Sequence, residues 1–270
     1  MPYALCPMPQ PIVCVKLSTN SMELQGDLRM GRVFITGAGR GLGLAFVKQC
    51  LERGDRVFAG VRRPEKAEQV QSLLAEYPEQ LELVALDVTD ADALEASWQQ
   101  IREKTEVLDL LINNAGINSM SADAGGSAAH LRLGQLESDR ILSMFNVNAI
   151  APLMIAQRFI DLLEGSSSPR IVSISSWLGS LTKKSSGGNY SYCASKTALN
   201  MLMRCLAFDV LPKGIVSIVV NPGWVQTDMG GSRAKLTPEE SVAGILNVVE
   251  NLTETDAGRF LNWDGSEHAW

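Results

Sequence analysis

From Arg32 onwards, short hydrophobic runs alternate with longer stretches in which apolar residues recur at helical spacing. The short runs are rich in Val, Ile, Leu and Phe and predict seven strands, at residues 32–36, 56–61, 81–86, 107–112, 170–175, 216–221 and 259–261. The longer stretches predict helices at residues 42–53, 64–76, 91–103, 139–163, 190–211 and 238–252. This alternation is typical of an α/β domain in which helices cover both faces of a parallel sheet.

Two of the predicted strands show how deeply the sheet is buried. Residues 108–112 and 215–220 are apolar almost throughout, where a strand with one wet face would alternate apolar and polar side chains. We therefore expect helices on both sides of the sheet. With no internal repeat and no low-complexity block, residues 32–270 are interpreted as the folded domain.

The first 31 residues differ from the rest of the chain. They contain four prolines by Pro11, show little periodicity, and have no charged segment leading into an apolar core as a secretory signal would. We expect residues 1–31 to be a poorly ordered N-terminal extension. Met22 and Met30 leave open a later start of translation, and the extension leaves open an organellar address.

Composition excludes several classes of protein. With 46% apolar and 20% charged residues, the chain can bury a core. A net charge of −6 provides no positive field for nucleic acid or an anionic membrane. The most apolar stretch, residues 141–163, is interrupted by Asn, Pro, Arg and Asp, which favours a buried helix over a membrane span. Five cysteines without a CxxC pair and two histidines favour neither a disulfide framework nor a metal site, so we expect a cytoplasmic protein.

A glycine-rich turn follows the first predicted strand. Thr36-Gly37-Ala38-Gly39-Arg40-Gly41-Leu42-Gly43 lies where that strand passes into a helix, which is where a pyrophosphate binds backbone N–H groups and the helix dipole. Residues without Cβ let the backbone approach the anion closely. No P-loop pattern occurs, so the turn favours a dinucleotide over a hydrolysed nucleotide.

The residues at the end of the second predicted strand indicate which dinucleotide is bound. An acid there would bind the 2′-hydroxyl of NAD(H), whereas this chain has Arg62 and Arg63, and Arg40 adds a guanidinium from the glycine turn. Two charge-assisted contacts to a 2′-phosphate, at about 1.5–3 kcal/mol each, would favour NADP(H) over NAD(H). The alternative is that Arg62 and Arg63 begin a solvated helix together with Glu65.

A phenol and an ammonium lie four residues apart in a predicted helix. Tyr192 and Lys196 therefore share one helix face, about one turn apart. Carbonyl reduction needs a proton donor, and we expect the lysine to lower the phenol's pKa with help from an oxidised nicotinamide. Ser176 follows a buried strand, so its hydroxyl could bind a substrate oxygen. Tyr190 is a competing phenol, but Ala194 stands four residues after it.

Residues 31–270 resemble the short-chain dehydrogenase/reductase family. The matching motifs are T-G-x-x-x-G-x-G at residues 36–43, Asn113-Asn114-Ala115-Gly116 after the fourth strand, Asn148, Ser176, Tyr192 with Lys196, and Pro222-Gly223 followed by Thr227. The resemblance implies a single Rossmann-type three-layer domain with a seven-stranded parallel sheet in the order 3-2-1-4-5-6-7.

The same resemblance implies roles for these residues. Tyr192 would be the general acid/base, Lys196 its pKa modifier and a ribose ligand, Ser176 the group that orients the carbonyl, and Asn148 part of a proton relay through water. Asp87 would line the adenine pocket, and Thr227 would contact the nicotinamide carboxamide. The implied cofactor-binding set is Gly37, Gly39, Arg40, Gly41, Leu42, Arg62, Asp87, Val88, Asn114, Ala115, Gly116, Tyr192, Lys196, Pro222, Gly223, Val225 and Thr227.

The C-terminal half resembles one branch of that family more closely. The segments 186–192 and 222–231, with Gly258-Arg259-Phe260, are similar to the C-factor branch, which includes the C-signal protein and sniffer-type carbonyl reductases. We therefore expect NADPH-linked reduction of a ketone, aldehyde or quinone. The alternative is a signalling or NADP(H)-sensing protein in which catalysis is secondary.

Two segments should border the substrate, the long connection at residues 117–135 and the short one after Thr227. The short one leaves little material for a lid, so we expect an open site. Trp177 and Trp224 could form aromatic walls or pack internally, and Cys193 is interpreted as a small packing residue. In related enzymes the two long helices form dimer and tetramer faces, which makes a homodimer or homotetramer an open expectation.

Overall fold

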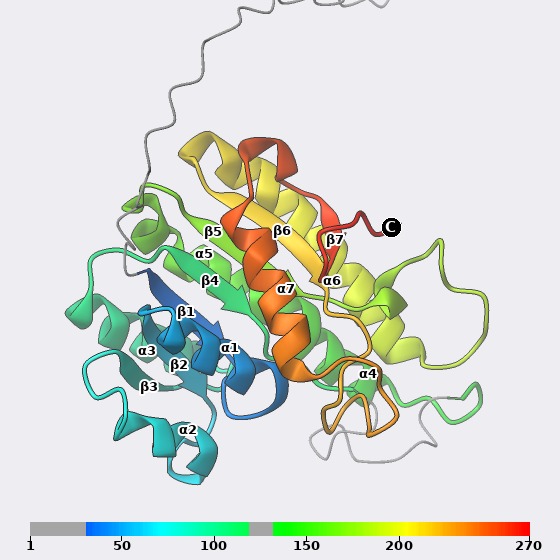
Figure 1. Ribbon diagram of the computed structural model, residues 1–270. Coiled ribbons are helices and arrows are strands. Elements are labelled where there is room, and N and C mark those ends of the chain that lie inside the picture. Colours follow the sequence, from blue (N-terminus) through cyan, green and yellow to red (C-terminus); the bar gives the residue numbers. More distant parts are fainter. Residues whose placement is uncertain (1–30, 119–131) are drawn as a thin grey trace, which may run out of the picture.

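The fold is an α/β sandwich around one parallel sheet, shown by a computed structural model that describes residues 31–118 and 132–270 (Figure 1). The sheet has seven strands in the order β3-β2-β1-β4-β5-β6-β7, which confirms the Rossmann-type order expected from the sequence. The strands are β1 (Arg32–Thr36), β2 (Arg56–Val61), β3 (Leu81–Ala85), β4 (Leu110–Asn113), β5 (Arg170–Ile174), β6 (Val216–Asn221) and β7 (Phe260–Asn262). Most of the predicted N-terminal extension, and residues 119–131 of the connection predicted at 117–135, lie outside the described residues.

Helices cover both faces of the sheet. One face carries α1 (Gly41–Glu52), α2 (Glu68–Leu74) and α7 (Pro238–Glu250), and the other carries α3 (Ala91–Lys104), α5 (Ala151–Glu164) and α6 (Tyr190–Val210). Strand β1 shows the two-sided burial, because Val33 and Ile35 enter the first core and Phe34 enters the second. The Phe34 ring lies 4.8 Å from that of Phe159 on α5. The apolar strands of the sequence are thus explained by a sheet that is dry on both faces.

The helix predicted at residues 139–163 is divided into three parts. It consists of α4 (Ser138–Phe145), a π-helical turn at Asn146–Ile150, and α5. Pro152 lacks the N–H that would donate to the carbonyl of Asn148, and its ring would collide with that carbonyl in a regular α-helix. The wider π turn accommodates the proline, and it is the segment that carries Asn148.

Other element boundaries differ less from prediction. The helix predicted at 64–76 is a 3-10 turn (Pro64–Lys66) followed by α2, and β4 begins at Leu110 rather than at residue 107. The Leu108 N–H donates to the Leu162 carbonyl of α5, so this residue joins the helical layer instead of the ladder.

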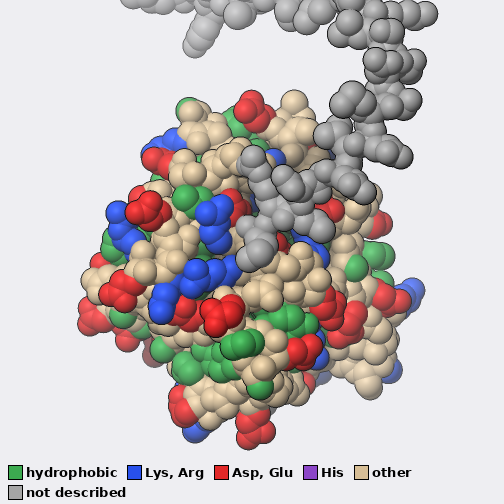
Figure 2. All heavy atoms as spheres, turned by 60° about the vertical axis from the view of Figure 1, so that its left-hand side comes forward, with side chains coloured by type: hydrophobic (Ala, Val, Ile, Leu, Met, Phe, Trp, Pro, Cys, Tyr) green, Lys and Arg blue, Asp and Glu red, His purple; other side chains and the backbone are tan. Residues whose placement is uncertain are grey.

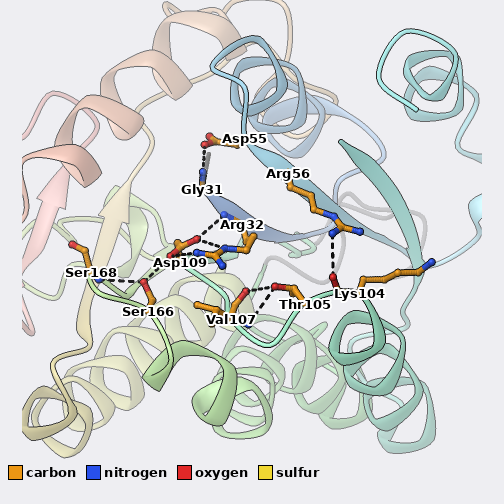
Figure 3. A network of polar contacts seen from close by, with 10 residues as sticks. All are labelled: Gly31, Arg32, Asp55, Arg56, Lys104, Thr105, Val107, Asp109, Ser166 and Ser168. Carbon is orange, nitrogen blue, oxygen red and sulfur yellow. Dashed lines mark hydrogen bonds and ion pairs between the residues drawn. The ribbon is translucent and has the colours of Figure 1, made fainter. Parts of the chain in front are cut away.

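A polar network holds the amino-terminal edge of the sheet (Figure 3). Asp109 accepts hydrogen bonds from the backbone N–H and the Nε of Arg32, both at 2.8 Å, and from Ser166 Oγ at 2.7 Å. Burial raises the pKa of Asp109, but the hydrogen bonds from Arg32 and Ser166 outweigh it and hold the pKa below its ordinary value. Beside this network, the N–H of Gly31 donates to Asp55 Oδ1 at 2.9 Å, so Gly31 belongs to the folded unit rather than to the extension.

The surface carries charges of both signs, and acidic and basic side chains are interspersed on the face seen in Figure 2. Across residues 31–118 and 132–270, none of the helices combines the length and the apolar character needed to span a bilayer.

Candidate active site

The predicted site residues lie at the carboxyl edge of the sheet. The glycine turn follows β1, Asn114 follows β4, Ser176 follows β5 and Pro222 follows β6. The order of the strands brings these four connections together, and Figure 1 shows the turn after β1 and the segment before α7 at the same edge. Ligands of open α/β sheets bind at this edge.

The glycine turn is shaped by close backbone contacts. Gly37 and Gly41 have φ of 66° and 55°, in the left-handed region that favours glycine. A Cβ on Gly43 would lie 2.1 Å from the Gly37 carbonyl oxygen. Within α1, all of which is described, no acidic residue lies in the first turn and no side chain caps the helix at Arg40. The helix therefore offers its first N–H groups to an anion.

Thr36 and Asn114 hold the turn against β4. Thr36 Oγ1 accepts from the N–H groups of Asn114 and Ala115, each at 3.1 Å. The Asn114 amide donates to the carbonyls of Thr36 and Gly37, at 2.9 and 3.1 Å. The side chain of Asn114, a residue of the implied cofactor-binding set, thus shapes the turn. Thr36 is part of the family motif, but its bridging role needs the pairing of β1 with β4 and has no local signal.

Arg40 and Arg62, which are predicted to bind a 2′-phosphate, interact with different acidic residues. The positive charge of Arg62 acts on Asp87, and its effect combines with hydrogen bonds from Thr89: burial raises the pKa of Asp87, but these groups lower it below its ordinary value. Arg40 instead forms an ion pair with Asp228, at 2.6 Å between Nη1 and Oδ2. Sequence reasoning did not single out Asp228.

The candidate proton donor and its lysine are both buried on α6. Tyr192 is 8% exposed and Lys196 is 4% exposed, whereas the competing Tyr190 is 39% exposed at the start of the helix. Lys196 Nζ donates to the Ile174 carbonyl at the end of β5, at 2.8 Å. Ser176 hydrogen-bonds the Tyr192 phenol, and its Oγ also accepts from the Leu178 N–H at 3.2 Å. The structure therefore brings Ser176, Tyr192 and Lys196 together.

Burial governs the ionisation of this pair. It raises the pKa of Tyr192 to about 12, which the Ser176 hydrogen bond lowers only in part. It lowers the pKa of Lys196 to about 8, because the ammonium is removed from water. Loss of solvation therefore dominates the pKa of both groups, and the lowering of the phenol's pKa expected from Lys196 together with an oxidised nicotinamide stays a prediction.

Asn148 supports the site from the π turn. Its Oδ1 accepts from the Ile117 N–H and its Nδ2 donates to the Ile117 carbonyl, both at 2.8 Å. Nδ2 also donates to Ser195 Oγ on α6 at 3.1 Å. A Cβ on Gly116 would lie 3.3 Å from Asn148 Oδ1 and 3.5 Å from Lys196 Nζ, so these three residues are neighbours. The side-chain amide of Asn148 acts as a brace between the connection after β4 and α6.

The connection after β6 reaches across to the glycine turn and to the phenol. A Cβ on Gly41 would lie 3.2 Å from Thr227 Cγ2. Two residues on, Met229 Sδ lies 3.8 Å from the Tyr192 hydroxyl, which donates to it. Sequence reasoning gave Met229 no role, although it lies in the segment 222–231 that resembles the C-factor branch and in the short connection after Thr227. At the start of this connection, Gly223 has φ of 81°, and the Pro222 carbonyl accepts from Ser241 Oγ at 2.7 Å.

The remaining cofactor-binding candidates line the two ends of this edge. A Cβ on Gly39 would lie 3.6 Å from Val61 Cγ1 at the end of β2. Leu42 and Val88 are partly buried and pack on the first and second cores, and Val225 is buried in an isolated bridge with Leu236.

The aromatic candidates are half exposed. Trp177 and Trp224 are 48% and 47% exposed, which favours aromatic walls over internal packing. The Trp224 Nε1 donates to the Gly230 carbonyl at 2.8 Å, so this ring lies on the same segment as Met229. Cys193 is buried, in agreement with a packing role.

The fold and this arrangement define an oxidoreductase of the Rossmann type. Residues 32–237 match the family model for short chain dehydrogenases, and the chain belongs to that family. A curated relative, C-signal of Myxococcus xanthus, is 36% identical over 166 residues, which are 62% of this chain and 95% of that protein. The similarity places the chain in the C-factor and sniffer branch.

Two solved structures share the whole domain. The NADPH-bound carbonyl reductase from chicken fatty liver is 37% identical with a TM-score of 0.82, over 90% of this chain and 100% of that chain. The carbonyl reductase Sniffer of D. melanogaster is 32% identical, also with a TM-score of 0.82 and the same coverage.

Proposed function

We propose that the protein is an NADPH-dependent reductase of ketone, aldehyde or quinone carbonyls, with Tyr192 as proton donor. The observation that carries this proposal is the buried phenol of Tyr192, hydrogen-bonded by Ser176 and one helical turn from Lys196. It lies at the same sheet edge as an uncapped helix N-terminus behind a glycine turn. Carbonyl reduction by a dinucleotide needs a proton donor and a site that binds the diphosphate of the cofactor.

The residues present fit a dinucleotide. Glycines stand where a Cβ would meet backbone, at Gly37 against Ala115 and at Gly43 against Gly37. The first N–H groups of α1 can receive the diphosphate. Asp87 and Val88 follow β3, and Asn114, Ala115 and Gly116 follow β4, which is paired with β1. When bound there, NADPH would supply the hydride that a carbonyl carbon accepts.

Residues of the chain would donate the proton that the carbonyl oxygen receives. A phenol with a pKa of about 12 is fully protonated at neutral pH, which is the form that a proton donor for reduction requires. Ser176 Oγ would hold the carbonyl oxygen beside Tyr192 Oη, and that hydroxyl would give its proton to the oxygen. Lys196 Nζ, placed one turn away, would stabilise the phenolate left behind before solvent reprotonates it.

The apolar surroundings of the phenol suggest the kind of carbonyl. Met229 covers the Tyr192 hydroxyl, and Trp177 directly follows Ser176 in the chain. These side chains, with Trp224, are all more than two-fifths exposed. Exposed aromatic and thioether groups beside a buried polar atom favour an apolar or aromatic carbonyl compound over a small charged one.

The preference for NADPH is supported by Arg40 and Arg62. Titration of intrinsic or cofactor fluorescence with NADPH and NADH tests this preference. We expect the Kd for NADPH to be lower than the Kd for NADH by about 100-fold or more. Arg62→Gln should weaken NADPH binding with little effect on NADH. Arg63→Gln, the exposed neighbouring residue, is the matched control. Equal affinity of the wild type for both cofactors would rule out the proposed phosphate site.

A second candidate is a signalling or NADP(H)-sensing role, favoured by the similarity to C-signal. In that case Tyr192→Phe should act like the wild type in a biological assay, while a change that disrupts Gly41 should abolish the response. Loss of the response in Tyr192→Phe would exclude this second candidate.

A further inference from the structure

An exposed ion pair joins the glycine turn to the connection after β6. Arg40 Nη1 lies 2.6 Å from Asp228 Oδ2, although the two residues are 188 positions apart. Their side chains are 68% and 76% exposed, so water competes fully for both groups. The pair spans the edge at which the dinucleotide is proposed to bind, and it engages one of the two arginines assigned to the 2′-phosphate.

Asp228 belongs to a compact turn that also carries Met229. The Gly230 N–H donates to Thr227 Oγ1 at 3.2 Å, and the Gly231 N–H donates to the Thr227 carbonyl at 2.8 Å. These bonds enclose residues 227–231 in one hydrogen-bonded unit. A displacement of Asp228 is therefore transmitted to Met229, whose Sδ lies 3.8 Å from the Tyr192 hydroxyl.

The strengths of the two interactions decide which partner Arg40 takes. An exposed ion pair contributes a factor of about two to five to an equilibrium. A phosphate dianion offers bidentate, charge-assisted hydrogen bonds to the same guanidinium, which are the stronger kind. Arg40 should exchange Asp228 for the phosphate whenever NADP(H) is present, and it should keep Asp228 when the cofactor lacks that phosphate.

We propose that Asp228 is a specificity-determining residue that holds Arg40 until the 2′-phosphate of NADP(H) displaces it, and that this exchange releases Met229 from Tyr192. This inference rests on the proposed function. The 2′-phosphate then does more than bind the cofactor, because its binding also uncovers the Tyr192 hydroxyl for the substrate. With NADH the pair persists and Met229 keeps the hydroxyl covered.

The variant Asp228→Asn separates these effects. It removes the competitor for Arg40, so the Kd for NADPH should fall about two- to fivefold, whereas the Kd for NADH should stay within the error of measurement. The same variant should raise kcat with saturating NADH, because Met229 is no longer held over the phenol. Glu79→Gln, an exposed acid just before β3, is the control for loss of one negative charge.

A double-mutant cycle with Arg40→Gln completes the test. In the Arg40→Gln background, Asp228→Asn should no longer change the Kd for NADPH, since the pair is already broken. Weaker binding of both cofactors by Asp228→Asn would overturn the inference. It would indicate that the pair of Arg40 and Asp228 stays intact and helps to hold the bound cofactor. An unchanged Kd for NADPH, or an unchanged kcat with NADH, would also overturn it. The proposed function fails separately, if wild-type protein shows no preference for NADPH.

Discussion

Asn148 Nδ2 donates a hydrogen bond to Ser195 Oγ at 3.1 Å, which ties the π turn to the helix that carries Tyr192 and Lys196. Ser195 Oγ donates in turn to the Tyr192 carbonyl at 2.9 Å. The brace therefore acts on the backbone of the proton donor itself. Ser195 is fully buried, so this contact is protected from water.

Removal of the brace should reduce stability and turnover together. Asn148→Ala leaves the buried N–H and carbonyl of Ile117 without their partners, which costs about 1–3 kcal/mol of unfolding free energy. Ser195→Ala loses the hydrogen bond from Asn148 and its own bond to the Tyr192 carbonyl but leaves the Ile117 backbone groups paired, and we expect about 1 kcal/mol. Urea unfolding followed by circular dichroism measures both. An Asn148→Ala protein as stable as the wild type would contradict the role of the brace.

Gly43 tests the glycine turn. In Gly43→Ala the new Cβ would lie 2.1 Å from the Gly37 carbonyl, so the turn must shift, and we expect a loss of about 1–3 kcal/mol with a loss of NADPH binding. Gly187→Ala is the matched control, because no described atom lies within 4 Å of its Cβ position. Thermal unfolding with and without NADPH compares them. Normal cofactor binding by Gly43→Ala would be inconsistent with a diphosphate held by this turn.

Asp109 should account for part of the loss of folding stability in acid. Its pKa is held below its ordinary value, so it stabilises the folded state above pH about 4 and this contribution is lost as pH falls through the folded-state pKa. Asp109→Asn should cost about 1–2 kcal/mol at pH 7 and flatten the decline of stability in acid. Glu79→Gln, at the exposed acid just before β3, is the control for loss of one negative charge. Parallel curves for Asp109→Asn and the wild type would refute the prediction.

Lys196 should weaken the fold at neutral pH. Burial lowers its pKa from 10.5 to about 8, which corresponds to about 3 kcal/mol in favour of the neutral amine. The folded state therefore binds fewer protons than the unfolded state between these values, and stability rises as pH rises from 8 to 10.5. After subtraction of the lost bond to Ile174, Lys196→Met should be about 1–3 kcal/mol more stable at pH 7 while losing turnover. Chemical unfolding at pH 7 and 10.5 checks this, and an equal gain at both pH values would contradict it.

The sequence predicted those features that follow from local pattern. Apolar runs such as residues 216–221 marked the buried strands, and the glycines after Thr36 marked the turn because their spacing is dictated by backbone contact within eight residues. The strand order came from resemblance to the family and is confirmed.

Other features depend on contacts between distant segments. Arg40 contacts Asp228 and Tyr192 contacts Met229 only because β1 and β6 end, and α6 begins, at one edge of the sheet. The extent of burial of Tyr192 and Lys196 also escaped prediction, since spacing along a helix reveals the neighbouring lysine but not how completely both groups are removed from water. The π turn was missed because Pro152 was treated as compatible with one continuous helix.

The consumption of NADPH by Tyr192→Phe tests the central claim most directly. With a panel of aromatic and aliphatic ketones, aldehydes and quinones, the wild type should oxidise NADPH, and Tyr192→Phe should lose about three orders of magnitude or more in kcat while it still binds the cofactor. Tyr190→Phe, which removes the exposed phenol two residues earlier, should keep wild-type turnover. Unchanged turnover in Tyr192→Phe would contradict the account.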